Sequence, residues 1–182
     1  MGLTRETAAL AASTPIHRAG EWVVALAGNP NVGKSTVFNA LTGMHQHTGN
    51  WSGKTVGCTA GKCEIGDASF TLVDLPGCYS LLSHSAEEEA ARDMLCRGEA
   101  DLAVVVCDAT CVERNLNLAL QIRQIVPRTL LCINLMDEAK KRRISIDTEL
   151  LSRRLGMPVI GICARLIDFC IFQDIFQNYY HL

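Results

Sequence analysis

The stretch GNPNVGKS, residues 28–35, decides how this 182-residue chain folds. It fits the pattern GxxxxGK[ST], which requires a strand before it and a helix after it. The apolar, β-rich run 22–27 supplies the expected strand, and residues 35–41 supply the expected helix. In such a loop, backbone N–H groups and the dipole of the following helix hold phosphate oxygens. The stretch therefore predicts a phosphate-binding loop.

Strands and helices alternate through the rest of the chain. Near-continuous apolar strands separated by helices indicate a parallel sheet that is covered on both faces. A turn at Gly66 and Asp67, between two β-rich runs, indicates one antiparallel hairpin. The predicted fold is a doubly wound α/β P-loop NTPase, with a mostly parallel sheet and one antiparallel edge strand. The expected strands are 57–65, 69–74, 102–108, 129–134 and 158–162, and the expected helices are 85–96, 112–125 and 147–155.

Composition places the chain among ordinary globular domains. Apolar residues make up 48% and charged residues 20%, which argues against disorder. The net charge of −2 gives no overall basic field, so no nucleic-acid partner is expected. No window reaches the roughly eighteen apolar residues that a membrane span needs. Nine cysteines without a CxxC pair are interpreted as small buried hydrophobes of a reduced cytosolic domain.

Two motifs, GKS at residues 33–35 and DLPG at residues 74–77, predict how a nucleoside triphosphate and Mg²⁺ would be held. Lys34 would reach the β- and γ-phosphate oxygens, and Ser35 would ligate Mg²⁺. Asp74 follows a strand and would hold the Mg²⁺ shell through water, while Gly77 lets a backbone N–H approach the γ-phosphate. The predicted nucleotide-binding residues of the loop itself are Gly28, Asn29, Pro30, Asn31, Val32, Gly33, Lys34, Ser35 and Thr36.

The sequence NLMD at residues 134–137 predicts recognition of guanine. The Asp137 carboxylate would accept hydrogen bonds from guanine N1–H and the exocyclic amine, a donor pair that adenine lacks. The alternative interpretation of Asp137 is a helix N-cap. Asn134 belongs to the same motif, and backbone N–H groups at Cys163 and Ala164 would reach guanine O6. In this order, the motifs predict a guanine-nucleotide switch domain.

The segments GNPNVGKST, GNWSGKTV, DLPGCYSL and INLMDEAKKRRISID resemble the N-terminal G domain of the bacterial ferrous iron transport protein B family. The resemblance runs from about residue 22 to residue 165. It implies a GTPase of the Ras-like fold on the cytoplasmic face of the inner membrane. A small helical domain and a multi-span ferrous permease would follow in the same chain, and any oligomer would form through that parent transporter.

The resemblance also implies roles for individual residues. Thr55 would be the switch I threonine that ligates Mg²⁺, and Asn31 would help to bind K⁺, although Asn31 has the alternative role of a turn residue. The implied catalytic residues are Lys34, Asn31, Thr55 and Gly77. Cys78 stands where Ras-type enzymes carry a water-positioning glutamine, so slow intrinsic hydrolysis is expected. Cys78 is also, with Cys58, a candidate for redox sensitivity.

The expected domain organisation has three parts. Residues 1–21 form a flexible leader, 22–165 the GTP-binding domain, and 166–182 an atypical aromatic tail, either a natural amphipathic tail or an altered start of the helical domain. The expected function is GTP binding and slow hydrolysis that regulates ferrous iron transport, with GTP or GDP, Mg²⁺ and K⁺ as cofactors.

Three alternatives stay open at this stage. The chain is alternatively a soluble GTPase of ribosome assembly or tRNA modification. It is alternatively a nucleotide-dependent interaction module with negligible turnover. The basic run at residues 140–143 is interpreted as a solvated helix end, with contact to a partner or to lipid as its alternative.

Overall fold

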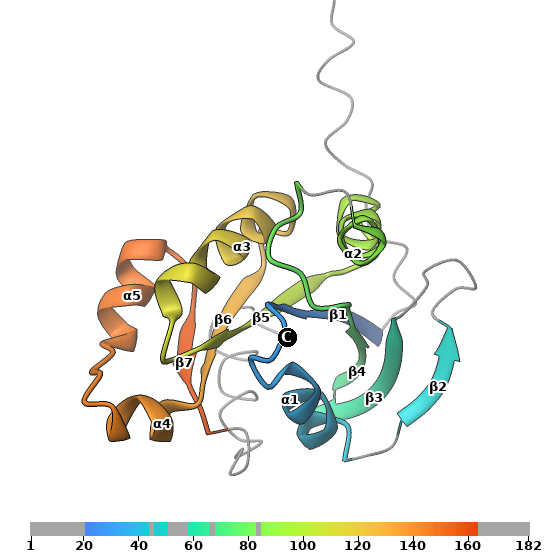
Figure 1. The fold of residues 1–182 in the computed structure, drawn as a ribbon. Helices are drawn as coiled ribbons and strands as arrows, with labels where there is room; N and C mark the ends of the chain where they lie inside the picture. Colours follow the sequence, from blue (N-terminus) through green and yellow to red (C-terminus); the bar gives the residue numbers. More distant parts are fainter. Residues whose placement is uncertain (1–20, 44–45, 51–57, 66–67, 83–84, 164–182) are drawn as a thin grey trace, which may run out of the picture.

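The computed structural model describes residues 21–43, 46–50, 58–65, 68–82 and 85–163. They form one seven-stranded sheet in the order β2-β3-β4-β1-β5-β6-β7 (Figure 1). The strands are β1 (Glu21–Gly28), β2 (Gln46–Asn50), β3 (Thr59–Ile65), β4 (Ala68–Asp74), β5 (Leu102–Asp108), β6 (Thr129–Asn134) and β7 (Val159–Gly161). The helices are α1 (Lys34–Leu41), α2 (Ala86–Cys96), α3 (Val112–Ile125), α4 (Met136–Lys141) and α5 (Thr148–Leu155).

The sheet is mostly parallel, as predicted. β1 lies at its centre and pairs in parallel with β4 on one side and β5 on the other. β3 runs antiparallel to both of its neighbours, and the hairpin it forms with β4 confirms the expected antiparallel pair. The antiparallel strand is not outermost, however. β2 pairs with it from outside, in a polar stretch whose composition gave no strand signal.

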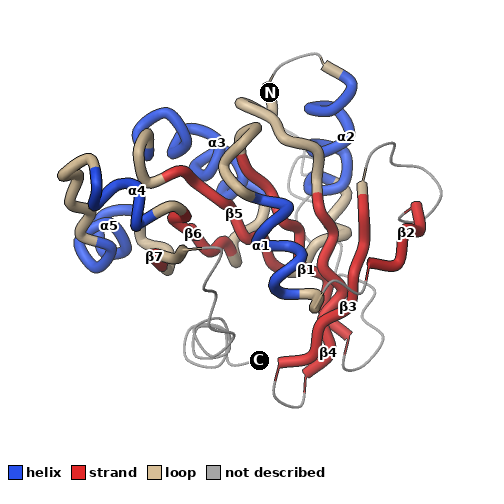
Figure 2. The backbone as a smooth tube through the Cα atoms, turned by 60° about the horizontal axis from the view of Figure 1, so that its bottom comes forward, coloured by secondary structure: helices blue, strands red, loops and turns tan. Residues whose placement is uncertain are grey.

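Two buried clusters, one on each face of the sheet, make the fold doubly wound. One cluster joins alternate residues of the central strands to α2 and α3, with residues such as Met94 and Leu118 at its centre. The other joins the remaining alternate residues to α1 through Val37, Phe38 and Leu41. This alternation explains why β5 and β6 are apolar almost throughout. In both backbone views, α4 and α5 lie at the β6–β7 end of the sheet, opposite β2 and β3 (Figures 1 and 2).

The helix boundaries follow from local chemistry. The Ser85 side chain accepts from the Glu88 backbone N–H while Glu88 reaches back to Ser85, which forms a capping box at the start of the expected helix. Asp147 caps α5 in the same manner by accepting from the Leu150 N–H at 2.8 Å. The short helix α4 ends within the basic run at residues 140–143, which the sequence indicated as a helix end. None of the helices in the described ranges has the length and apolar character that crossing a bilayer demands.

Candidate nucleotide-binding site

The loop between β1 and α1 has the geometry that phosphate binding requires. A Cβ atom at Gly28 would lie 2.6 Å from the carbonyl oxygen of Val106 on β5, so β1 can end there only in glycine. Gly33 has φ +85°, a left-handed conformation that turns the chain into α1. No side chain caps the N-terminus of α1. The first N–H groups of that helix therefore point at the loop as donors for an anion.

Asn134, at the end of β6, holds the phosphate loop in place. Its Nδ2 donates to the Val32 carbonyl oxygen at 3.0 Å, and the residue is only 1% exposed. A Cβ atom at Gly33 would lie 2.3 Å from the same Nδ2, so the glycine is needed to admit the asparagine. One residue of the predicted guanine motif thus positions the predicted phosphate loop, across 102 residues of sequence.

Lys34 and Asp74 form an ion pair beside this loop. They meet because β4 lies next to β1, with Asp74 in register with Leu26. Their side chains are only 10% and 15% exposed. Burial raises the pKa of Asp74, and the Lys34 ammonium beside it opposes that shift. The pair therefore concentrates a cation and a carboxylate where phosphate and a metal shell were predicted.

The segment that follows Asp74 continues alongside the phosphate loop. Leu75 N–H donates to Leu26 O at 2.9 Å, and Cys78 N–H donates to Gly28 O at 3.2 Å. A Cβ atom at Gly77 would lie 3.2 Å from Pro30 Cα, so glycine permits this close approach of two backbones. Gly77 thus lies against the phosphate loop, as the motif spacing indicated.

Helix α3 holds the next residues of this segment. The Arg114 guanidinium lies 4.7 Å from the centroid of the Tyr79 ring. The Gln121 side-chain oxygen accepts from Ser80 Oγ at 3.2 Å and from Leu81 N–H at 2.8 Å. Sequence analysis missed Arg114 and Gln121, because contacts across about 40 residues leave no local pattern.

The predicted guanine motif lies at the same edge of the sheet. Leu135 adopts φ 63° and is itself the N-cap of α4, so the alternative role of Asp137 as an N-cap is wrong. Asp137 lies exposed in the first turn of that helix. Met136 N–H donates to Ile162 O at 3.3 Å, which brings Cys163 close to the motif. Ala164 lies outside the described residues, as does Thr55.

The remaining loop residues differ in exposure. Asn31 is exposed with φ 65°, and Ser35 and Thr36 are exposed on the first turn of α1. Asn29 is 3% exposed, and both polar atoms of its side chain have no hydrogen-bond partner among the described residues. Only the backbone of Asn29 is therefore placed to contact a phosphate.

The structure does not support redox sensitivity at Cys58 or Cys78. Both side chains are buried, at 5% and 3% exposure. Burial raises the pKa of Cys78 to about 11 and also raises the pKa of Cys58. Reactive cysteines are exposed and have lowered pKa values, so both of these thiols are core residues.

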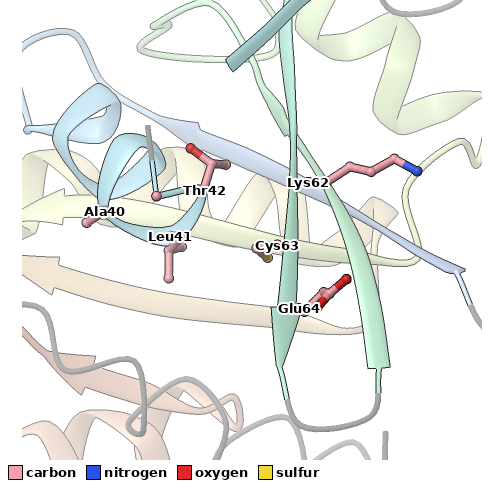
Figure 3. A pocket seen from close by; sticks show the side chains of 7 residues that line it. Ala40, Leu41, Thr42, Lys62, Cys63 and Glu64 are labelled. Atoms are coloured by element: carbon pink, nitrogen blue, oxygen red, sulfur yellow. The ribbon is translucent and has the colours of Figure 1, made fainter. Parts of the chain in front are cut away.

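One pocket lies away from this site, between the end of α1 and β3 (Figure 3). Leu41, Thr42 and Cys63 line it, and Lys62 extends away from α1 beside it. It is at the opposite end of α1 from Lys34. The pocket is therefore separate from the phosphate loop.

A phosphate loop after the central strand, an aspartate on the adjacent strand and an NxxD loop at the same edge define a P-loop guanine-nucleotide-binding domain. Comparison with known families gives the same class. The family model described as ferrous iron transport protein B matches residues 22–168. The chain belongs to this family and carries its N-terminal G domain, which confirms the resemblance identified in the sequence.

Individual relatives agree with this assignment. The Fe(2+) transporter FeoB of Escherichia coli K12 is 44% identical over 143 residues, which are 76% of this chain and 18% of that protein. The G domain of the T. maritima FeoB iron transporter has a TM-score of 0.80 at 38% identity, covering 89% of this chain and 99% of that one. A GDP form of the T. maritima cytosolic domain has a TM-score of 0.81 at 38% identity, with coverages of 92% and 65%. The chain thus spans about a fifth of the length of the transporters it matches.

Gly33→Ala is expected to weaken GDP binding at least tenfold. The new methyl group would displace the Asn134 amide, and a lost buried hydrogen bond costs about 1–3 kcal/mol. Gly156→Ala is the matched control, because Gly156 also has positive φ (61°) but faces only the flexible end of Arg123. Gly156→Ala should lose about 1 kcal/mol of stability from its positive φ alone, and Gly33→Ala should lose more because the hydrogen bond goes as well. Titration with a fluorescent GDP analogue should separate them, and equal affinities would contradict the role of Asn134.

Thiol labelling checks the cysteine assignment. At pH 8, Cys96 and Cys111, which are exposed, should react with a maleimide long before the buried thiols do. Because burial raises the pKa of Cys78 to about 11 and of Cys63 to about 12, labelling of these two should accelerate as pH rises toward those values. Peptide mapping by mass spectrometry gives the rate at each site. Comparable rates at Cys78 and Cys96 at pH 8 would contradict the buried assignment.

Proposed function

We propose that this chain binds GTP and hydrolyses it slowly to GDP and phosphate, as the nucleotide switch of a ferrous iron transporter. The observation that carries the proposal is the hydrogen bond from Asn134 to Val32 O. It fastens the guanine motif to the phosphate loop, so one ligand that contains both guanine and phosphates fits both motifs at once.

Specificity for guanine is assigned to the exposed carboxylate of Asp137. It would accept from guanine N1–H and the exocyclic amine, and an adenine base would leave it facing no donor. Backbone N–H groups at Cys163 and Ala164 are proposed to reach guanine O6. Leu135 stands where related motifs carry lysine, so packing of that long side chain across the base is lost.

The phosphates are assigned to Lys34, Gly77 and the loop from Gly28 to Thr36. Lys34 would exchange its ion pair with Asp74 for the β- and γ-phosphate oxygens, which frees the carboxylate of Asp74. The hydroxyl of Ser35 and the carboxylate of Asp74 are oxygen donors, which is the chemistry that Mg²⁺ prefers. Ser35 and Thr55 would hold the ion directly, and Asp74 through water. Bound there, Mg²⁺ neutralises charge on the phosphates.

Hydrolysis is assigned to positioning rather than to a general base. Cys78 follows Gly77 but is buried, so it cannot orient a water molecule as glutamine does. The proposed catalytic residues are Lys34, Asn31, Thr55 and the backbone of Gly77, which stabilise charge as water attacks the γ-phosphate in line. Asn31 is exposed at the loop, where its side-chain oxygen is free to ligate K⁺.

The place of this domain in a larger protein is also a proposal. Its relatives are named Fe(2+) transporters, and the chain spans 18% of their length. We assign residues 22–165 to a cytoplasmic G domain, attached at the bacterial inner membrane through a permease region that normally follows in the same chain. Residues 1–21 would be a leader and 166–182 an atypical aromatic tail, either natural or an altered start of a helical domain, and oligomers would form through the whole transporter.

Two other functions are less well supported. A GTPase of ribosome assembly or tRNA modification needs a basic and aromatic RNA-binding surface, and the family assignment favours a transporter instead. A nucleotide-dependent interaction module would bind GTP with negligible turnover. The hydrolysis experiment below separates that module from the proposed enzyme.

Asp137→Asn is expected to weaken GTP binding at least about 100-fold, because the amide would set an N–H donor against a guanine donor. The same change should strengthen binding of XTP, whose base offers a carbonyl oxygen in place of the amine. Glu138→Gln, one residue further along α4, is the control and should leave both affinities unchanged. Calorimetric titration measures all three proteins. Unchanged GTP affinity in Asp137→Asn would remove the assigned base contact.

Hydrolysis should be faster in KCl than in NaCl. With K⁺ ligated at Asn31, single-turnover rates are expected to rise at least about tenfold, and Asn31→Ala should abolish the difference. Asn117→Ala, an exposed asparagine on α3, is the control and should keep it. Equal rates in both salts would remove the ion site, whereas negligible turnover in both salts would favour the interaction module.

A further inference from the structure

One edge of the described structure, beside the proposed nucleotide contacts, carries a group of exposed basic side chains. Four arginine and lysine side chains there are exposed and form no ion pair with any residue in the described ranges. They extend from the last turn of α4 to the outer face of α5. Together with two exposed apolar residues, they define what we name the α4–α5 basic surface: Lys140, Arg142, Arg143, Ile144, Leu150 and Arg154.

The outer face of α5 is distinct from its packed face. Leu151 and Leu155 pack against the core. Leu150 and Arg154, four residues apart, share a flank of the helix beside this packed face, and Leu150 is 43% exposed. In Figures 1 and 2, α4 and α5 lie together at the β7 end of the sheet. The basic run of α4 and the outer face of α5 are therefore presented at one end of the domain.

Arg143 is a position where the backbone favours another residue. Its φ of 60° is left-handed, which glycine adopts freely and a long side chain adopts only with strain. Its N–H donates to Lys140 O at 3.0 Å, which closes the C-terminal turn of α4. A glycine would close that turn without strain. The chain therefore presents a charged side chain at a turn where glycine would be less strained.

The two apolar residues restrict the partner. Ile144 is 39% exposed and lies next to Arg143 in the chain. Exposed isoleucine and leucine among cations are typical of surfaces that lie in the headgroup region of a bilayer. Binding to single-stranded nucleic acid instead uses aromatic side chains, and residues 136–155 contain none. The chemistry of this surface therefore fits an anionic lipid membrane better than RNA.

We propose that the α4–α5 basic surface docks the domain on anionic phospholipid. The inference builds on the proposed function, since a domain that belongs to a transporter is held beside a bilayer. The four cations lie over lipid phosphates while Ile144 and Leu150 enter the headgroup layer. The base-contacting residue Asp137 lies on the same short helix as Lys140, so the docked edge adjoins the nucleotide site without occupying it.

The test is partition of the 182-residue chain onto vesicles. Vesicles with about one third phosphatidylglycerol should bind it at least tenfold more tightly than pure phosphatidylcholine at low salt, and 0.5 M salt should remove most of that preference. Lys140→Gln with Arg142→Gln should weaken partition more than tenfold, at about fivefold per charge. Lys62→Gln with Arg97→Gln removes two exposed cations elsewhere and is the matched control, with less than a twofold effect.

The Arg143→Gly variant distinguishes loss of vesicle binding through a lost charge from loss of binding through unfolding. It should weaken vesicle binding about fivefold while leaving the midpoint of thermal unfolding unchanged or higher, because strain at φ 60° is relieved. Ile144→Ser with Leu150→Ser should weaken binding to anionic vesicles further at high salt, where the apolar contribution remains. A loss of vesicle binding caused by unfolding would lower the midpoint instead, and that result counts against the proposal.

Other outcomes also decide the matter. Equal binding to both vesicle types, or equal losses in the test and control pairs, would overturn the proposal. So would tight binding to an RNA duplex that depends on Lys140 and Arg142 while vesicles are ignored. GDP affinity is measured on the same samples. A chain that binds GDP but not vesicles overturns only this surface, and one that binds vesicles but not GDP overturns only the proposed function.

Discussion

One hydrogen bond, from the Asn134 amide to the carbonyl oxygen of Val32, organises the nucleotide site. It is buried, and it joins the end of β6 to the loop that follows β1, although β5 lies between these strands. Gly33 is required because any side chain there would strike the amide. The guanine motif and the phosphate loop therefore form one unit, and the spacing between base and phosphate contacts is fixed before any ligand arrives.

Lys34 and Asp74 form a mostly buried ion pair, so any ligand that separates them must supply a new partner for each charge. Both side chains are mostly buried, and burial alone would raise the pKa of Asp74, so each group stabilises the charge of the other. In the proposed function, phosphate would compete with Asp74 for Lys34, and a metal shell would compete with Lys34 for Asp74. A nucleotide that arrives with Mg²⁺ would satisfy both groups together. Either component alone would leave one buried charge without its partner.

Much of the fold follows from local sequence, whereas the contacts that support the site do not. The GNPNVGKS loop, the apolar strands β5 and β6 and the Ser85–Glu88 capping box each have a pattern within a few residues. Strand β2 has no such local pattern, because its residues are polar. It is defined as a strand by its antiparallel pairing with β3. Gln121 carries no signal at all, since its role depends on a loop about 40 residues earlier. Thr55 and Ala164 stay predictions.

Helix α3 holds the segment after Gly77 through two of its side chains, Gln121 and Arg114. The Gln121 carboxamide oxygen accepts from two donors of this segment, and the Arg114–Tyr79 contact holds the same segment about two turns away along the helix. If Gly77 contacts the γ-phosphate as proposed, displacement of this segment on hydrolysis would change these contacts with α3. A partner bound only to that helix would then be exposed to the difference between the two nucleotides.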